Sequence, residues 1–272
     1  LVETNGNMEQ AIELLRSKSQ ASADKQSTKV AGEGLVVVKV SEDNKKAVML
    51  EVNSQTDFVA KDASFIEFVN KVAVAALANS ISDINLLKDV KLDDGSTVEQ
   101  TRVALVAVLG ENVVCRRMEL YVAGEGENLG TYVHNNNIAV LVKTQGSDLD
   151  LAKDMAMQVA ASNPLVVDPS DVPQDLVEKE KKIFTAQSKD SGKPDNIIEK
   201  MISGRIAKFV NEQSLVGQDF IKDSGLKVSK VLSQANAKVI SFARFMAGEG
   251  IEKVEDNFAE EVMAQAFGEG DS

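Results

Sequence analysis

The spacing of hydrophobic and polar positions changes period several times along this chain, and each change predicts an element. Apolar stretches on either side of a polar segment at 41–46 predict a β-hairpin. Apolar residues at helical spacing follow the hairpin, and an alternating stretch ends the unit. The predicted order is a hairpin, two helices and a closing strand, at residues 35–52, 65–77, 101–109 and 112–122.

The same order of patterns recurs further along the chain, at residues 129–143, 151–161, 228–234 and 239–246. The phrase Ala-Gly-Glu-Gly follows each predicted closing strand, at 123–126 and at 247–250. We therefore predict an α+β fold made of two similar subdomains, each an antiparallel sheet with helices on one face. The first comprises residues 33–127, and the second comprises 128–172 and 228–250.

Three further segments lie outside this duplicated core. Residues 173–227 contain two amphipathic patterns around Ser-Gly-Lys-Pro at 191–194, which predicts an inserted helical hairpin. The tail, 251–272, predicts a C-terminal helical module. Residues 1–18 carry an apolar stripe that a lone helix cannot bury, so we expect them to be the remnant of an N-terminal helical domain in a truncated chain. The Ser, Lys, Gln and Ala of 19–32 predict a linker.

Composition narrows the classes of function. The 272 residues carry a formal net charge of -12, whereas tracking of nucleic-acid phosphates needs a basic surface. An acidic membrane surface would repel the chain as well, and apolar stretches such as 72–78 are far too short to span a bilayer. The single cysteine, Cys115, excludes an internal disulfide and fits a cytoplasmic location.

Few residues are suited to nucleophilic or metal chemistry. The only histidine, His134, falls at a predicted hairpin turn, and Cys115 fits a small buried strand residue better than a nucleophile. The glycines of 124–130 have the wrong spacing for a dinucleotide loop. We therefore predict no catalytic residue, no cofactor and no metal site, and expect any catalysis to act on another macromolecule.

The stretch Glu-Val-Asn-Ser-Gln-Thr-Asp-Phe-Val-Ala-Lys at 51–61 marks the passage from a strand to a helix. Ser54 is suited to be the N-cap, and Asp57 three positions on completes a capping pattern. On one interpretation Asp57 is only a cap and Phe58 a core residue. On the other, a turn presents the carboxylate and the aromatic ring outward for function. The chemistry of these residues leaves both interpretations open.

This eleven-residue stretch resembles, at every position, the second signature of the elongation factor Ts family, the nucleotide exchange factors of elongation factor Tu. Residues 5–12 resemble the last helix of the family's N-terminal ubiquitin-associated-like domain, and the family's first signature would lie before Leu1. Further segments resemble the family in the family's order, at 101–106, 110–112, 155–162, 191–194, 199–205, 208–209, 212–220 and 248–253.

The resemblance implies a mechanism and a partner. In the family the Thr-Asp-Phe-Val segment is pressed into the GTPase domain of Tu near its Mg²⁺ and phosphate sites, and GDP escapes. The corresponding residues are Thr56, Asp57, Phe58 and Val59. Further partner contacts are implied at Met155, Gln158, Ser162, Lys193 and Phe258, although family members often have His at the position of Gln158.

The implied partner is elongation factor Tu, in its GDP-bound and nucleotide-free forms, with no direct contact to nucleic acid or membrane. The resemblance leaves monomer and homodimer both open. The alternative is a non-catalytic scaffold that holds partners together without changing nucleotide affinity. An enzyme acting on small molecules is a distant third, because the chain has one His and one Cys.

Overall fold

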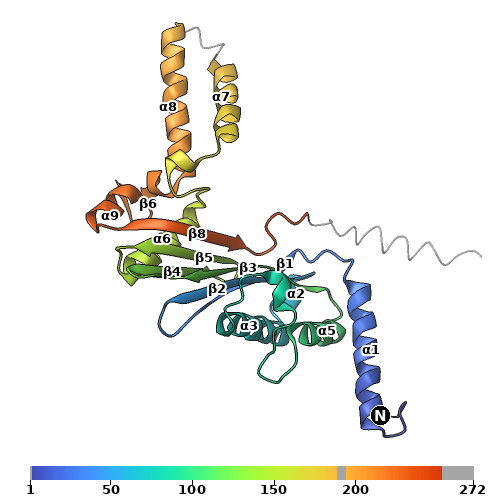
Figure 1. The fold of residues 1–272 in the computed structure, drawn as a ribbon. Helices are drawn as coiled ribbons and strands as arrows, with labels where there is room; N and C mark the ends of the chain where they lie inside the picture. The colour runs from blue at the N-terminus through green and yellow to red at the C-terminus, as the bar shows by residue number, and fades with distance from the viewer. Residues whose placement is uncertain (1, 189–193, 253–272) are drawn as a thin grey trace, which may run out of the picture.

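The computed structural model describes residues 2–188 and 194–252, and Figure 1 shows the arrangement of its helices and strands. The first half contains α1 (Met8–Gln26), β1 (Glu33–Val40), β2 (Lys46–Ser54), α2 (Asp57–Ala60), α3 (Ala63–Ala78), α4 (Ile84–Leu87), α5 (Val98–Leu109) and β3 (Val113–Val122). The second half contains β4 (Glu127–His134), β5 (Ile138–Gln145), α6 (Leu149–Ser162), η1 (Pro169–Asp171), α7 (Gln174–Ser188), α8 (Asp195–Gln213), η3 (Leu215–Gly217), β6 (Asp219–Phe220), β7 (Asp223–Lys227), α9 (Val228–Gln234) and β8 (Lys238–Met246).

Two antiparallel sheets repeat one topology. The first has the order β1-β2-β3 and the second the order β4-β5-β8, so each hairpin receives its third strand beside the hairpin's second strand. Both sheets shift register at matching places, between Glu51 and Val52 in β2 and between Lys143 and Thr144 in β5. The predicted α+β fold of two similar subdomains is confirmed.

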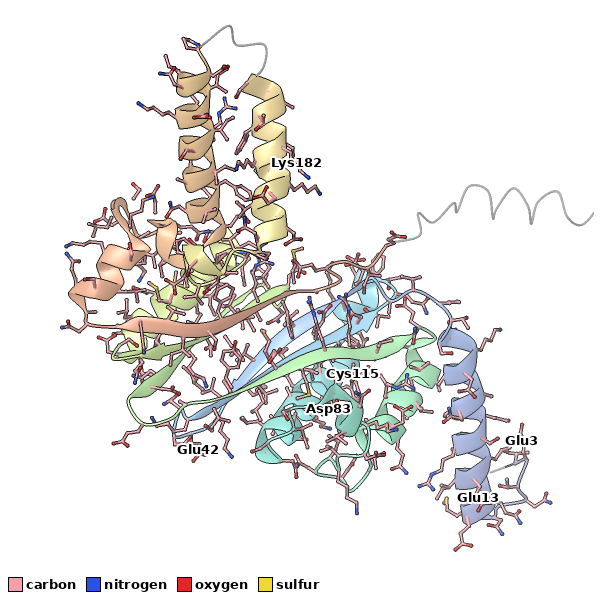
Figure 2. All side chains as sticks on the ribbon, turned by 45° about the horizontal axis from the view of Figure 1, so that its top comes forward. Glu3, Glu13, Glu42, Asp83, Cys115 and Lys182 are labelled. Atoms are coloured by element: carbon pink, nitrogen blue, oxygen red, sulfur yellow. The ribbon has the colours of Figure 1, made fainter. Side chains whose placement is uncertain are left out.

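The two sheets pack face to face, with helices on the outer face of each. Along β2, Val48 and Leu50 join the core beneath α3 and α5, whereas Ala47 and Met49 pack against the second sheet. The same alternation in β5 sends side chains either to α6 and α9 or to the first sheet. Figure 2 shows side chains filling these layers. The central strands are consequently buried on both faces.

A buried carboxylate bridges the two sheets. Glu51, fully buried in β2, forms ion pairs with Arg116 and Arg117 of β3 and accepts a hydrogen bond of 2.8 Å from the backbone N–H of Gly248. Burial alone would raise the pKa of Glu51, but the Gly248 N–H, Arg117 and Asn53 outweigh it, and the pKa lies below its ordinary value. Glu51 thus joins the first sheet to the segment that follows β8.

The boundaries of several predicted segments differ in the structure. Helix α1 continues to Gln26, through much of the predicted linker 19–32, because its Ala, Lys and Gln are good helix formers and Ala23 is buried in the first core. The predicted hairpin 173–227 is α-helical only in α7 and α8. Its last residues instead form η3 and the β6–β7 pair, where Leu215 and Phe220 enter the second core. The predicted C-terminal helix at 251–272 lies almost entirely outside the described residues.

Candidate functional site

The stretch that carries the resemblance comprises the end of β2 and a single turn of helix, α2, at one end of the first sheet (Figure 1). Its N-cap is Thr56, whose hydroxyl oxygen accepts a hydrogen bond from the Val59 N–H at 3.4 Å. The prediction that Ser54 caps this helix is wrong: Ser54 is the last residue of β2, and its hydroxyl donates to the Thr56 carbonyl oxygen. The ladder of β2 reaches two residues further than the hydrophobic pattern indicates.

Helix α2 has two side chains that anchor it in the core and one large side chain that faces solvent. Val59 and Ala60 are 8% and 6% exposed and belong to the first core, whereas Phe58 is 81% exposed. A large aromatic side chain loses favourable burial free energy in such a position. Phe58 is therefore not a core residue, and of the two sequence interpretations only the outward-facing one fits its position.

Asp57 lies in the first turn of α2 and is also exposed. Its carboxylate pairs with Lys61 at 2.6 Å, and the hydrogen bond from Lys61 holds the pKa of Asp57 below its ordinary value. The turn therefore presents an ionised acid next to an uncovered ring. The pair is solvent-exposed, so it can open when another charged group approaches.

Thr56 is fixed from outside the turn by Glu111, a residue for which the sequence predicts no role. Glu111, in the connection between α5 and β3, accepts hydrogen bonds from the Thr56 backbone N–H at 3.0 Å and the Thr56 hydroxyl at 2.6 Å. The two residues are 55 positions apart, so no local pattern connects them. The only signal in the sequence is that Glu111 falls in one of the segments that resemble the family.

The second subdomain has no counterpart of α2. Eight residues, 55–62, separate β2 from α3, whereas three residues, 146–148, separate β5 from α6. The longer connection holds the whole of α2. The second sheet thus connects to its helix without such a turn, and α2 is a feature of the first repeat.

The other residues implied by the resemblance lie elsewhere. Met155 and Gln158 are fully buried in α6, so their side chains pack the second core and present no surface to a partner. Gln158 accepts a hydrogen bond from the Ile221 N–H at 2.8 Å and donates to the Asp219 carbonyl oxygen at 3.1 Å. Ser162 is half-buried and bonded to Gln218 at 2.6 Å. Lys193 and Phe258 lie outside the described residues.

The described residues offer little else for chemistry. His134 is exposed at the end of β4 and stacks on Tyr132, and burial raises the pKa of the Cys115 thiol to about 12. Residues 2–188 and 194–252 contain no group of three or more His, Cys, Asp or Glu placed to hold a metal ion. No helix in the same ranges has both the length and the hydrophobicity to cross a membrane.

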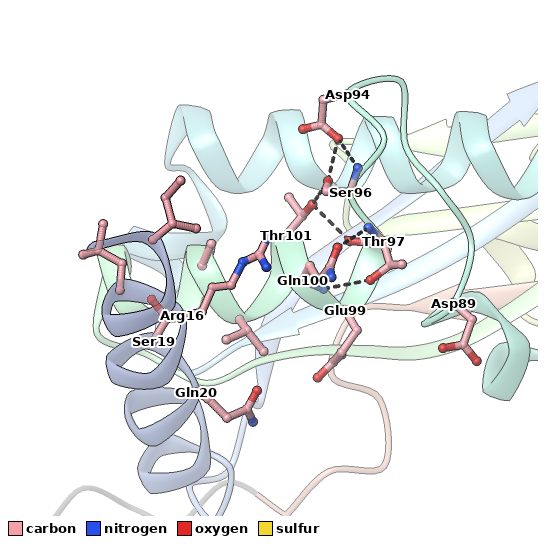
Figure 3. Close-up of a pocket in the computed structure, with 14 residues that line it drawn as sticks. Arg16, Ser19, Gln20, Asp89, Asp94, Ser96, Thr97, Glu99, Gln100 and Thr101 are labelled. Atoms are coloured by element: carbon pink, nitrogen blue, oxygen red, sulfur yellow. Dashed lines mark hydrogen bonds between the residues drawn. The ribbon is translucent and has the colours of Figure 1, made fainter. Parts of the chain in front are cut away.

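A cavity of about 810 Å³ lies between α1 and α5 (Figure 3). Apolar side chains of both helices line it, including Ile12 and Val103, together with polar groups such as Arg16 and Asp94. Its lining includes neither histidine nor cysteine and no residue of α2. The hydroxyl groups in the cavity therefore have no histidine beside them to act as a base, and the cavity is separate from the exposed turn.

Comparison with known proteins identifies the family. The family model described as "Elongation factor TS" matches residues 55–249, a span that begins one residue before Thr56. The chain belongs to the elongation factor Ts family. The elongation factor Ts of Thioalkalivibrio sulfidiphilus (strain HL-EbGR7) is 53% identical over 268 residues, covering 98% of this chain and 91% of the relative. That of Legionella pneumophila (strain Paris) is 52% identical over 266 residues, covering 97% and 90%.

Similarity of this level extends to other bacteria, as the elongation factor Ts of Methylococcus capsulatus (strain ATCC 33009 / NCIMB 11132 / Bath) is 48% identical over 265 residues. Elongation factor Ts acts in translation elongation as the nucleotide exchange factor of elongation factor Tu. This chain is accordingly an exchange factor and not an enzyme, since nucleotide release makes and breaks no covalent bond.

Proposed function

We propose that the chain releases GDP from elongation factor Tu by inserting the α2 turn next to the Mg²⁺ and phosphate site of its partner. We call Thr56, Asp57, Phe58 and Val59, the N-cap and the first three residues of α2, the exchange turn. The observation that carries the proposal is the 81% exposure of Phe58 on a turn whose neighbours are anchored in the core. An uncovered ring on a fixed base can enter an apolar pocket of another protein.

The two exposed residues of the exchange turn have different tasks in this proposal. Burial of the Phe58 ring in the partner drives insertion and displaces the elements that hold Mg²⁺. Asp57 competes for polar groups near the phosphates once its exposed pair with Lys61 opens. Val59 stays in the core and fixes the base of the turn.

The energetics require contacts beyond the exchange turn. Accelerating GDP release about 10⁴-fold needs roughly 5.5 kcal/mol of preferential stabilisation of the dissociating state. Burying one aromatic side chain provides about 2 to 3 kcal/mol. We infer that the second subdomain, including the half-buried Ser162, and the helical hairpin supply further partner surface, as do the segments that hold Lys193 and Phe258. Coupling is reciprocal, so GDP and this chain weaken each other's binding to Tu by the same factor.

The test is GDP release from elongation factor Tu loaded with a fluorescent GDP analogue. We expect Phe58→Ala to lower the exchange rate more than about tenfold, while the midpoint of thermal unfolding stays nearly unchanged because an exposed side chain contributes little to folding. Leu86→Ala, which removes another exposed hydrophobic side chain, from α4, is the control and should exchange at the wild-type rate.

Two outcomes would count against the proposal. If the wild-type chain binds Tu without accelerating release, the scaffold alternative replaces exchange as the function of this chain. If Phe58→Ala lowers the unfolding midpoint by many degrees, the ring serves the fold, and the exchange turn loses its central residue.

A further inference from the structure

Glu111 occupies a short, tightly fixed connection between α5 and β3. Gly110 ends α5 in a left-handed conformation, with a φ of 74°, and turns the chain so that Glu111 faces the end of β2. The next residue, Asn112, is 4% exposed and donates a hydrogen bond of 2.8 Å to the Lys29 carbonyl oxygen. The connection is thereby fixed to the chain between α1 and β1, so Glu111 has a firm base.

Both oxygens of the Glu111 carboxylate are directed at one residue. One oxygen accepts from the Thr56 N–H at 3.0 Å and the other from the Thr56 hydroxyl at 2.6 Å. A hydroxyl has one proton and two lone pairs, so donation to Glu111 turns a lone pair of Thr56 toward the Val59 N–H. The carboxylate therefore fixes the backbone and also the capping group of the exchange turn.

The electrostatic setting of Glu111 supports this role. Glu111 is half-buried, and in the part of the chain that the structure describes it forms no ion pair with Lys or Arg. Glu51, by contrast, is neutralised by two arginines. Hydrogen bonds to an ionised acceptor are about twice as strong as neutral ones, so the Thr56 donors are strong partners for this carboxylate.

We propose that Glu111 is the positioning residue of the exchange turn. It holds α2 in the free protein so that Phe58 already points outward when Tu arrives, and the entropy of ordering a four-residue turn is not lost on binding. The inference rests on the proposed function of Phe58. Glu111 acts through Thr56 and touches neither Tu nor its nucleotide.

The test is a double-mutant cycle on the exchange rate, with wild type, Phe58→Ala, Glu111→Ala and the double variant. Glu111→Ala should slow exchange about tenfold, because a misplaced ring loses its productive geometry. In the Phe58→Ala background the same substitution should slow exchange less than about twofold, since no ring remains to be positioned.

Two further variants separate positioning from charge and stability. Glu111→Gln keeps one carbonyl acceptor but turns an amide NH₂ toward a Thr56 donor, so we expect an intermediate loss of about threefold. Glu42→Ala removes an equal charge from the tip of the β1–β2 hairpin, labelled in Figure 2, and should leave exchange unchanged. Thermal unfolding of each variant accompanies the rates, and Glu111→Gln replaces Glu111→Ala throughout the cycle if the alanine variant does not fold.

Three results would overturn the inference. Equal slowing by Glu111→Ala with and without the Phe58 ring would show that Glu111 acts independently of it. A wild-type exchange rate in Glu111→Ala would show that the exchange turn keeps its conformation without Glu111. A wild-type exchange rate in Phe58→Ala would refute the proposed function and the positioning role with it. This outcome is distinguished from the other two because the single Phe58 variant is measured first.

Discussion

Phe58 and Gln158 lie at opposite extremes of solvent exposure, 81% and 0%, although the family resemblance implies a partner contact for both. The side-chain carbonyl of Gln158 accepts from the Ile221 N–H, and its amide group donates to the Asp219 carbonyl oxygen and to Ser162 and Gln218. These bonds tie α6 to the β6–β7 pair. Substitution of Gln158 should therefore lower the stability of the fold and leave the exchange rate of the folded protein unchanged.

We expect Gln158→Ala to lower the free energy of unfolding by about 2 to 3 kcal/mol, because it removes a fully buried side chain and leaves the Ile221 N–H and the Asp219 carbonyl oxygen without this partner. Urea unfolding measures the effect. Exchange by the folded fraction should stay close to wild type. An unchanged stability together with slower exchange would instead return Gln158 to the partner surface.

For single residues, the sequence predicts the type of interaction, such as a helix cap, better than the residue that makes it. The sequence predicts that a helix follows β2, but it does not predict a helix of one turn. It favours Ser54 as the cap instead of Thr56, because Ser-x-x-Asp is a good capping pattern and the length of a strand ladder depends on its neighbours. The contact of Thr56 with Glu111 depends on tertiary structure, and local patterns do not contain it.

At the scale of elements, the second subdomain depends on a close approach of helix α6 to strand β4. The two meet at Gly130, where an added Cβ would lie 1.9 Å from the Ala152 carbonyl oxygen. Backbone on both sides leaves no flexible side chain that could move away. The register of β4 against α6 therefore requires a residue without a side chain at this position.

We expect Gly130→Ala to destabilise the protein by more than about 2 kcal/mol, the range for overpacking against a rigid neighbour. Gly204→Ala is the matched control: Gly204 lies within α8 with open space around it, so alanine should stabilise by about 0.5 to 1 kcal/mol. Chemical unfolding of both variants measures the contrast. Equal effects would mean that the approach at Gly130 relaxes without cost.

Long periodic segments were predicted best. The two hairpins, helix α6, helix α9 and the closing strands agree with prediction to within two residues at every end. The one-turn helix α4 and the short β6–β7 pair were missed because four or five residues are too few to show a period. The extension of α1 was missed because the composition of 19–26 suits both a linker and a helix.

For the whole molecule, the sequence predicted two similar subdomains but not how they meet. Their sheets stack, and the contact contains the ionic group of Glu51, Arg116 and Arg117 with the segment after β8. Arg117 also lies over the Phe245 ring at 4.2 Å. In the sequence, the only sign of this contact is the acidic Glu51 within an otherwise apolar strand, and the sequence does not specify which arginines pair with it.

We expect Glu51→Gln to lower the free energy of unfolding at pH 7 by about 2 to 3 kcal/mol, because two arginines lose their buried partner. The folded-state pKa of Glu51 lies below its ordinary value of 4.5, so its contribution is complete above pH 4.5 and is lost as the pH falls through the folded-state pKa. The free energies of unfolding of wild type and Glu51→Gln should therefore converge at acid pH.

Urea unfolding of both proteins between pH 7 and pH 3 measures this convergence. Glu67→Gln, which removes the acid of an exposed pair with Lys71, is the control and should change stability by less than about 0.5 kcal/mol at any pH. A constant difference between wild type and Glu51→Gln over the whole range would show that the glutamate does not titrate with folding.

The connection of 55–62, five residues longer than its counterpart at 146–148, has a consequence for how such a protein changes over time. Because Phe58 at the tip of the insertion is exposed, a substitution there leaves the packing of the stacked layers intact. On the proposed function, the exchange rate can therefore change by single substitutions at this tip while the framework of the two sheets stays the same.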